Sequence, residues 1–403
     1  MKWLGLPILL LLLVGFGTQA EEDGGDEYIA TQLTYDYLFL VEALIRHERY
    51  TEAAEELDGL LARVADNRYE TALVHQTYGY VAIGLNDYPA AITHFMGAIN
   101  SSALPDQVTH SLRYTTAQLQ LQLQEDNAKA ALQLLQLWFE LEQQPPPRAY
   151  VLLAQVYRSL ARWKPAIKAL KLAIKQSDEV EESWYQLLVG LYLETEQLQP
   201  AAELLQKMVG MFPDNADYWR QLAGVLMQQQ REKAATAVMA LAAEKGLLKA
   251  GELRRLANLY LHQNMPLDAA ELVETHIMSG LLKANVRNLS LLADAWVLAR
   301  EPEKALPIFS RLSNIDLSGR SDLKWGSLLI ELELWETAAT RLQRGIERKK
   351  KPSARDWLLL GTSYARSERR QQAIDAFTKA RDASVKKQER HQAEQWLEYL
   401  AAE

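Results

Sequence analysis

The chain has 403 residues, of which 48% are hydrophobic and 24% are charged, and its formal net charge at pH 7 is −8. Because nucleic-acid binding needs a concentrated basic face, this acidic balance argues against a nucleic-acid partner. The sequence contains no cysteine, which excludes disulfides and thiolate metal sites.

The first twenty residues have the layout of a secretory signal peptide. Lys2 supplies positive charge, Leu4–Phe16 is an apolar run broken only by Gly and Pro, and small residues stand at −3 and −1 of a cut after Ala20. We therefore predict export, with a signal peptide over residues 1–20 and an acidic leader over residues 21–33. A retained N-terminal anchor is the alternative, although the run is short for a bilayer span. An exported chain without cysteine fits the periplasm, so we expect a periplasmic protein with no stable membrane span after cleavage.

A skeleton of apolar and small residues recurs every 33–39 residues along the rest of the chain. In the clearest copy the skeleton occupies relative positions 4, 7, 8, 11, 20, 24 and 27, which are Trp357, Leu360, Gly361, Tyr364, Ala373, Phe377 and Ala380. The copies begin near residues 34, 72, 111, 147, 182, 216, 250, 286, 319 and 354. This period, with small residues at positions 8, 20 and 27, resembles the tetratricopeptide repeat (TPR), in which each unit is two antiparallel helices.

The spacing has a simple physical explanation. Positions 4, 7, 8 and 11 form one apolar stripe on a first helix, and positions 20, 24 and 27 form another on a second helix. Small residues at positions 8 and 20 allow the two helices to approach closely. We therefore predict an all-α TPR superhelical solenoid over residues 34–385, with a capping helix over residues 386–403. HEAT-type arrays are disfavoured because their period is longer.

Two local features leave alternatives open. The segment Gln143–Pro147 contains three consecutive prolines and ends a helix. It is either a stiff turn, which we favour, or a hinge between two sub-arrays. The basic run Arg348–Lys351 is expected to be a hydrated turn, and the alternative is a contact with anionic lipid headgroups or an acidic partner.

The sequence shows no pattern that is typical of catalysis. The seven histidines include no His-x-x-x-His pair, and there is no phosphate-binding Gly-rich loop and no Gly-x-Ser-x-Gly element. We therefore predict that the protein is not an enzyme and uses no cofactor and no metal.

The remaining candidate site is the concave groove that the TPR resemblance implies. In TPR proteins the first helices line this groove at relative positions 2, 5, 9, 12 and 13. Carried onto this chain, those positions give the candidate partner-binding residues Gln155, Arg158, Gln186, Arg220, Arg254, Asn258, Arg287, Ser290 and Asp294. Long amide and guanidinium side chains can hold an extended peptide through its backbone or a carboxylate. The simpler interpretation is that each is a solvated residue on an exposed helix face.

A narrower resemblance is carried by four segments: Asn215–Trp219, Glu244–Leu248, Trp357–Gly361 and Gln395–Leu400. In these the chain resembles the exported TPR proteins associated with TonB–ExbB–ExbD systems of gammaproteobacteria. The resemblance implies a periplasmic scaffold for protein–protein interaction that supports TonB-dependent transport, with an envelope component of that type as partner. Two alternatives stay open: a cell-envelope assembly adaptor for polysaccharide export or outer-membrane complexes, and a carrier of a small ligand, which no cavity signal supports.

Overall fold

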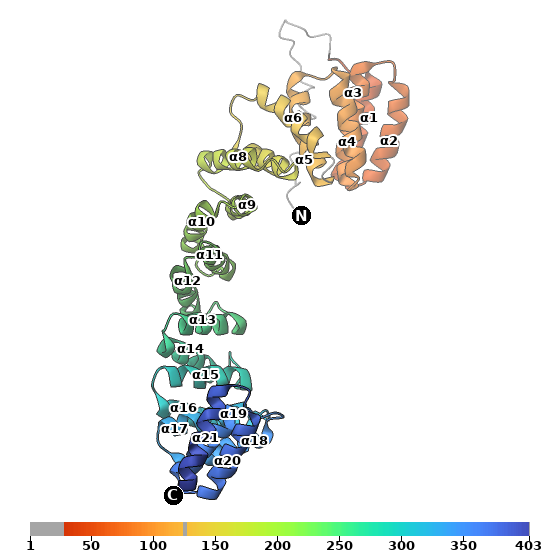
Figure 1. The fold of residues 1–403 in the computed structure, drawn as a ribbon. Helices are drawn as coiled ribbons and strands as arrows, with labels where there is room; N and C mark the ends of the chain where they lie inside the picture. The colour runs from red at the N-terminus through yellow and green to blue at the C-terminus, as the bar shows by residue number, and fades with distance from the viewer. Residues whose placement is uncertain (1–27, 124–126, 403) are drawn as a thin grey trace. The chain divides into compact units, whose positions relative to one another are not determined.

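The computed structural model describes residues 28–123 and 127–402, so the predicted signal peptide and residues 21–27 of the predicted leader lie outside the described residues. Within the described residues the chain forms 21 α-helices and no strand (Figure 1). The all-α class predicted from the sequence is confirmed. The chain divides into two compact units, residues 1–204 and residues 205–403.

The helices of the first unit are α1 (Gln32–Arg46), α2 (Tyr50–Arg63), α3 (Arg68–Gly84), α4 (Tyr88–Ser101), α5 (Asp106–Leu123), α6 (Ala128–Leu141), α7 (Pro147–Ser159), α8 (Trp163–Gln176) and α9 (Glu182–Glu194). Helix α10 (Leu198–Met211) contains the boundary between the units. The helices of the second unit are α11 (Ala216–Gln228), α12 (Glu232–Glu244), α13 (Ala250–His262), α14 (Pro266–Met278), α15 (Val286–Leu298), α16 (Pro302–Ile315), α17 (Arg320–Glu331), α18 (Trp335–Arg348), α19 (Ala354–Arg366), α20 (Arg370–Ala383) and α21 (Lys387–Ala402). Within each unit an odd-numbered helix packs against the even-numbered helix that follows it, and successive hairpins stack on one another.

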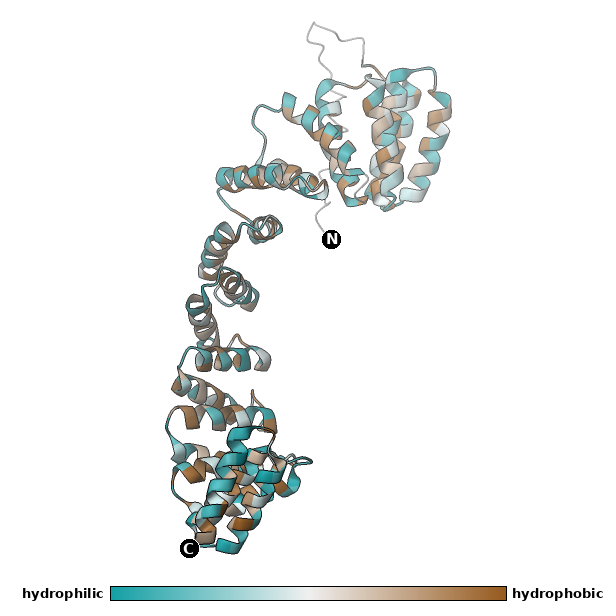
Figure 2. Ribbon diagram, in the orientation of Figure 1, coloured by the Kyte–Doolittle hydropathy of each residue, from teal (hydrophilic) through white to brown (hydrophobic). Residues whose placement is uncertain are grey.

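Each helix is amphipathic, as stacking requires. Figure 2 shows hydrophobic and hydrophilic residues on the same helices rather than on separate helices. The apolar stripes join into clusters that run across successive hairpins, such as the cluster of the second unit that contains Leu256, Leu292, Trp296 and Leu328. Because no hairpin buries its stripe alone, the stability of each hairpin depends on its neighbours.

The turn inside each hairpin has one repeated geometry. In all nine hairpins whose turn lies in the described residues, one non-glycine residue between the two helices adopts the left-handed conformation, with φ between 52° and 60°. In the α3–α4 turn this residue is Asn86, and the next N–H group, that of Asp87, donates to the carbonyl of Ala82 at 2.8 Å. The bond satisfies a carbonyl that the end of α3 would otherwise leave unpaired. The same turn geometry therefore recurs in each of these hairpins.

Small residues lie where the helices of a hairpin cross. A methyl group added at Gly361 in α19 would lie 2.7 Å from the ring of Phe377 in α20. One added at Gly326 in α17 would lie 2.5 Å from Cγ of Leu342 in α18. Both glycines occupy relative position 8, and these contacts explain why that position carries a small residue.

The hairpin of α17 and α18 is held by a buried ion pair. Asp322 is fully buried, and its carboxylate accepts hydrogen bonds from Nη1 of Arg348 at 2.9 Å and from Oγ of Ser313 at 2.5 Å. Nε of Arg344 lies 3.8 Å from the same carboxylate. Arg348 also donates to the carbonyls of Ser313, at 2.8 Å, and Asp316, at 3.2 Å.

This network corrects the interpretation of the basic run Arg348–Lys351 as a hydrated turn. Arg348 is the last residue of α18 and its charge is neutralised inside the protein. Nζ of Lys349 lies 2.5 Å from the carboxylate of Asp356. Only Lys350 and Lys351 are exposed, so half of the predicted basic cluster serves to join neighbouring repeats.

The Pro-rich segment connects two helices that are packed together. Pro147 is the first residue of α7, where a missing N–H group costs nothing. The rings of Phe139 in α6 and Tyr150 in α7 lie 5.2 Å apart, centroid to centroid. This contact is what a stiff turn would show, and the hinge stays an untested alternative.

Across residues 28–123 and 127–402, none of the helices combines the length and the apolar character that a bilayer span needs.

Candidate binding pocket

A cavity of about 490 Å³ lies on the first helices of three successive hairpins in the first unit. Helix α7 contributes the largest share of its lining, and α5 and α9 contribute the rest. The lining residues are Tyr114 and Gln118 from α5, Arg148, Val151, Leu152, Gln155 and Arg158 from α7, and Glu181, Ser183, Trp184 and Leu187 from α9 and its N-terminal end. Its volume is within the range that is typical of ligand pockets.

The pocket continues into a second cavity of about 460 Å³. Both cavities are lined by Arg148, Glu181 and Trp184, and the second is lined also by Pro146 and Pro147. Nη2 of Arg148 lies 3.0 Å from Oε1 of Glu181. This ion pair therefore lies where the two cavities adjoin.

The two arginines of the pocket lie at the two ends of its α7 lining. Arg148 and Arg158 are ten residues apart on α7, which corresponds to about 15 Å along the helix axis. Arg148 is paired with Glu181, whereas Arg158 is exposed and forms no ion pair with any residue of the described ranges. Burial raises the pKa of Tyr114, against the opposing effects of the Arg148 charge and a hydrogen bond with Gln118, so its hydroxyl stays protonated. The pocket therefore carries one unpaired cation, neutral hydrogen-bonding groups and apolar walls.

Two of the nine predicted groove residues, Gln155 and Arg158, line this pocket. Gln186 lies on the neighbouring α9, is exposed, and its Nε2 lies 3.4 Å from Oε1 of Glu182. That any of these residues contacts a partner stays a prediction.

The predicted groove residues of the second unit are engaged mainly with the protein itself. The guanidinium of Arg220 in α11 lies 2.5 Å from Asp217 and 3.2 Å from Glu252 in α13. The carboxylate of Asp294 in α15 lies 2.6 Å from Nζ of Lys324 in α17. The Arg220–Glu252 and Asp294–Lys324 pairs join successive hairpins, whereas the Arg220–Asp217 pair lies within α11.

The other members of the set are less constrained. Asn258 donates to the carbonyl of Arg254 at 2.8 Å, and Nε of Arg254 is buried without a hydrogen-bond partner. Arg287 is exposed and Ser290 is partly buried. Apart from the Asn258–Arg254 bond, no hydrogen bond or ion pair within the described residues links these four side chains.

Several lining residues were missed by the sequence analysis, chiefly Tyr114, Gln118, Arg148 and Trp184. Arg148 occupies relative position 2 of its repeat, so the positional rule could have found it. Trp184 is 6% exposed and would be assigned to the core from its sequence alone. Its part in the pocket depends on how α9 stacks beside α7.

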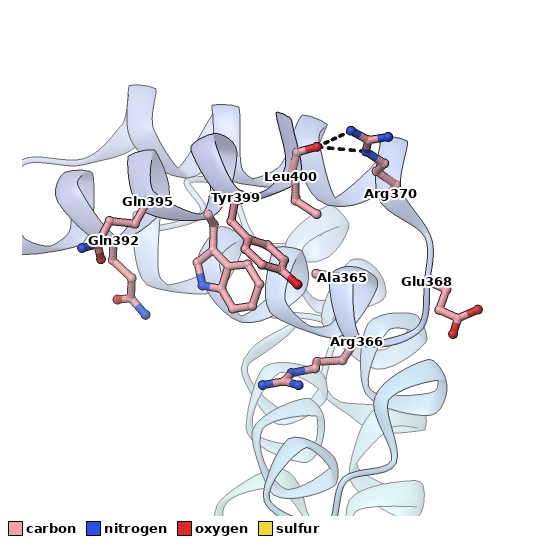
Figure 3. Close-up of a pocket in the computed structure, with 9 residues that line it drawn as sticks. Ala365, Arg366, Glu368, Arg370, Gln392, Gln395, Tyr399 and Leu400 are labelled. Atoms are coloured by element: carbon pink, nitrogen blue, oxygen red, sulfur yellow. Dashed lines mark hydrogen bonds between the residues drawn. The ribbon is translucent and has the colours of Figure 1, made fainter. Parts of the chain in front are cut away.

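A larger cavity of about 910 Å³ lies in the second unit between α21 and the α19–α20 hairpin (Figure 3). Nε of Arg370 donates to the carbonyl of Leu400 at 3.0 Å, and Nη2 of the same guanidinium donates to that oxygen as well. The indole of Trp396 stacks on Phe377 at 5.3 Å. These groups hold α21 against the last hairpin, and none of the nine predicted groove residues lines the cavity.

Comparison with protein families gives matches to models described as tetratricopeptide repeat over residues 147–179, 188–246 and 323–386. Among solved structures, the chain is similar to YrrB, described as a TPR protein with an unusual peptide-binding site, at 21% identity and a TM-score of 0.39 over 48% of this chain and 100% of that one. It is similar also to MamA of Desulfovibrio magneticus RS-1, at 19% identity and a TM-score of 0.39 over 46% and 99%. A third similar structure is pilF of Pseudomonas aeruginosa, at 18% identity and a TM-score of 0.35 over 54% and 96%. The comparison with curated proteins gives no match.

The stacked hairpins define an α-helical repeat protein. The family matches identify tetratricopeptide repeats over residues 147–179, 188–246 and 323–386, and the small residues at the helix crossings fit the same repeat. This fold is typical of scaffolds for protein–protein interaction.

Proposed function

We propose that the protein is a non-catalytic periplasmic scaffold that binds an extended peptide segment of a partner protein in the pocket of α5, α7 and α9. The observation that carries this proposal is the pocket itself, which has apolar walls, neutral amides and one unpaired guanidinium. A fold without built-in chemistry uses such a surface for recognition.

The dimensions of the pocket set the length of the peptide. About 15 Å separates the ends of the α7 lining, and an extended chain advances about 3.3 Å per residue, so the pocket spans about four or five residues. Gln118 and Gln155 can pair with the peptide backbone, and Val151 and Leu187 can cover an apolar side chain. Arg158 can pair with a carboxylate. We therefore expect a ligand with an apolar side chain near its middle and an acidic group at one end.

Binding to synthetic peptides tests this proposal. A positional-scanning library of fluorescein-labelled hexapeptides is titrated with the wild-type protein, with Gln155→Ala/Arg158→Ala, and with the control Arg162→Ala/Gln176→Ala. The control residues are exposed and lie outside the pocket. We expect wild type and control to select the same apolar and acidic peptides, and the pocket variant to bind them at least tenfold more weakly at an unchanged melting temperature. Equal binding by all three proteins would exclude this pocket.

The cellular role is proposed from the sequence. The layout of the first twenty residues supports export, and the resemblance carried by Asn215–Trp219 and Gln395–Leu400 supports a role beside TonB–ExbB–ExbD systems in TonB-dependent transport. Site-specific photocrosslinking from position 155 in intact cells tests this role. Crosslinks to a TonB-, ExbB- or ExbD-type component support it, and crosslinks to components of polysaccharide export or outer-membrane assembly favour the adaptor alternative.

A further inference from the structure

Two histidines that are distant in sequence meet inside the second hairpin. His75 lies in α3 and His94 lies in α4, and their Nδ1 atoms are 2.9 Å apart. The two rings are 5.1 Å apart, centroid to centroid, and inclined by 43°. Both side chains are partly buried.

The surroundings hold both rings in place. The imidazole of His94 stacks on the ring of Tyr78 at 3.9 Å with an interplanar angle of 4°. The charges of Asp58 and Asp87 both act to raise the pKa of His94, so both carboxylates lie near its ring. A cation bound between the rings would therefore lie in a region of negative charge, and the ring orientations are fixed in advance.

Two neutral imidazoles whose Nδ1 atoms are this close can interact in two ways. Either one Nδ1 carries a proton and donates it to the other, or both Nδ1 lone pairs point at a bound cation. The neutral ring is the form that binds metal ions.

The distance between the nitrogens selects the metal. With metal–nitrogen bonds of about 2.0–2.1 Å, two nitrogens 2.9 Å apart subtend an angle of about 90° at the ion. That angle belongs to the tetragonal geometry of Cu²⁺ and Ni²⁺, whereas tetrahedral Zn²⁺ would need a separation of about 3.3 Å. Cu²⁺ also binds nitrogen ligands more tightly than Ni²⁺ or Zn²⁺.

We propose that His75 and His94 form a copper(II) site that is separate from the peptide pocket. In the described part of the chain no group of three or more His, Cys, Asp or Glu side chains could hold a metal ion, so the protein supplies two ligands. Water occupies the other equatorial positions. The site is therefore open, and a ligand that binds copper can enter it.

Titration of tag-free protein with CuCl₂ in a non-coordinating buffer at pH 7.4, with glycine as competitor, tests the proposal. We expect one Cu²⁺ per chain, an axial electron paramagnetic resonance spectrum with hyperfine splitting from two nitrogens, and the order Cu²⁺ over Ni²⁺ over Zn²⁺. His75→Asn and His94→Asn should each weaken Cu²⁺ binding at least tenfold. An asparagine can keep a hydrogen bond to the remaining ring but is a poor copper ligand. These variants therefore separate the hydrogen bond between the two side chains from copper binding.

His47→Ala and His391→Ala are matched controls, because both histidines are exposed, His47 just after α1 and His391 within α21. They should bind Cu²⁺ as the wild type does. The proposal is wrong if the wild type lacks a site with one-to-one stoichiometry and two nitrogen ligands. It is wrong also if both asparagine variants keep wild-type affinity. The first of these results is measured on the wild-type protein, so it does not depend on whether a variant folds.

Discussion

Removing the carboxylate of Asp322 should open the hairpin of α17 and α18. Asp322 is fully buried, and its partner Arg348 is 23% exposed at its side chain. Removing one member of a buried ion pair typically costs about 3–5 kcal/mol, because the other charge stays buried without its partner. Arg348 keeps the carbonyls of Ser313 and Asp316 as acceptors, so the cost of Asp322→Ala should lie near the lower limit, about 3 kcal/mol.

Native-state hydrogen exchange is the suitable assay, because a repeat array opens locally rather than as one unit. A loss of about 3 kcal/mol corresponds to amide exchange in α17 and α18 that is about 10²-fold faster. The control is Glu336→Ala, which breaks an exposed ion pair between Arg369 and Glu336 at 2.5 Å. Exposed pairs contribute about 0–1 kcal/mol, so exchange should change less than about fivefold.

A second variant isolates the charge from the packing. Asp322→Leu combined with Arg348→Met replaces both charges with apolar groups, which is often neutral or stabilising for a buried pair. We expect it to exchange more slowly than Asp322→Ala. If Asp322→Ala and Glu336→Ala exchange at the same rate, the buried pair does not stabilise the hairpin and the reasoning fails.

Three further results are expected. Gly326→Ala should lower the urea midpoint of unfolding, because the new methyl group meets Leu342. The expected loss of unfolding free energy is about 1–3 kcal/mol. Gly224→Ala has no atom within 4 Å of the new methyl group and should raise stability by about 0.5–1 kcal/mol, so equal effects in the two variants would contradict the packing argument. Burial lowers the pKa of His75 and His94 in the folded chain, so the unfolded chain takes up protons first as the pH falls below about 6.5. Stability should therefore decrease from pH 7.5 to pH 5.5, and His75→Asn/His94→Asn should reduce this slope in urea titrations.

The fold could be predicted from the sequence because its determinants are local and repeated. An alanine at position 20 recurs in every repeat, most repeats carry glycine or alanine at position 8, and this spacing alone indicates two packed helices. The left-handed turn residue could not be predicted, because alanine, glutamate, glutamine, asparagine and arginine all occupy it. At that position the backbone is fixed by the packing of the two helices and not by the residue type.

The candidate site was harder to predict, because it depends on contacts between repeats. Glu181 meets Arg148 across 33 residues of sequence, and Trp184 reaches the same cavity from α9. Such pairings follow from the stacking angle, which the repeat pattern does not specify.

Charged residues at groove positions serve two competing purposes, and the contacts between repeats decide which one applies. Arg220 binds Glu252 across 32 residues and Asp294 binds Lys324 across 30, so in the second unit these charges join neighbouring hairpins. A ligand there would have to displace an ion pair before it gained one. Arg158 has no such partner among the described residues, and it lines a cavity. Because a ligand carboxylate gains most from a guanidinium that is not already neutralised, peptide binding should concentrate on α5, α7 and α9 rather than spread evenly along the array.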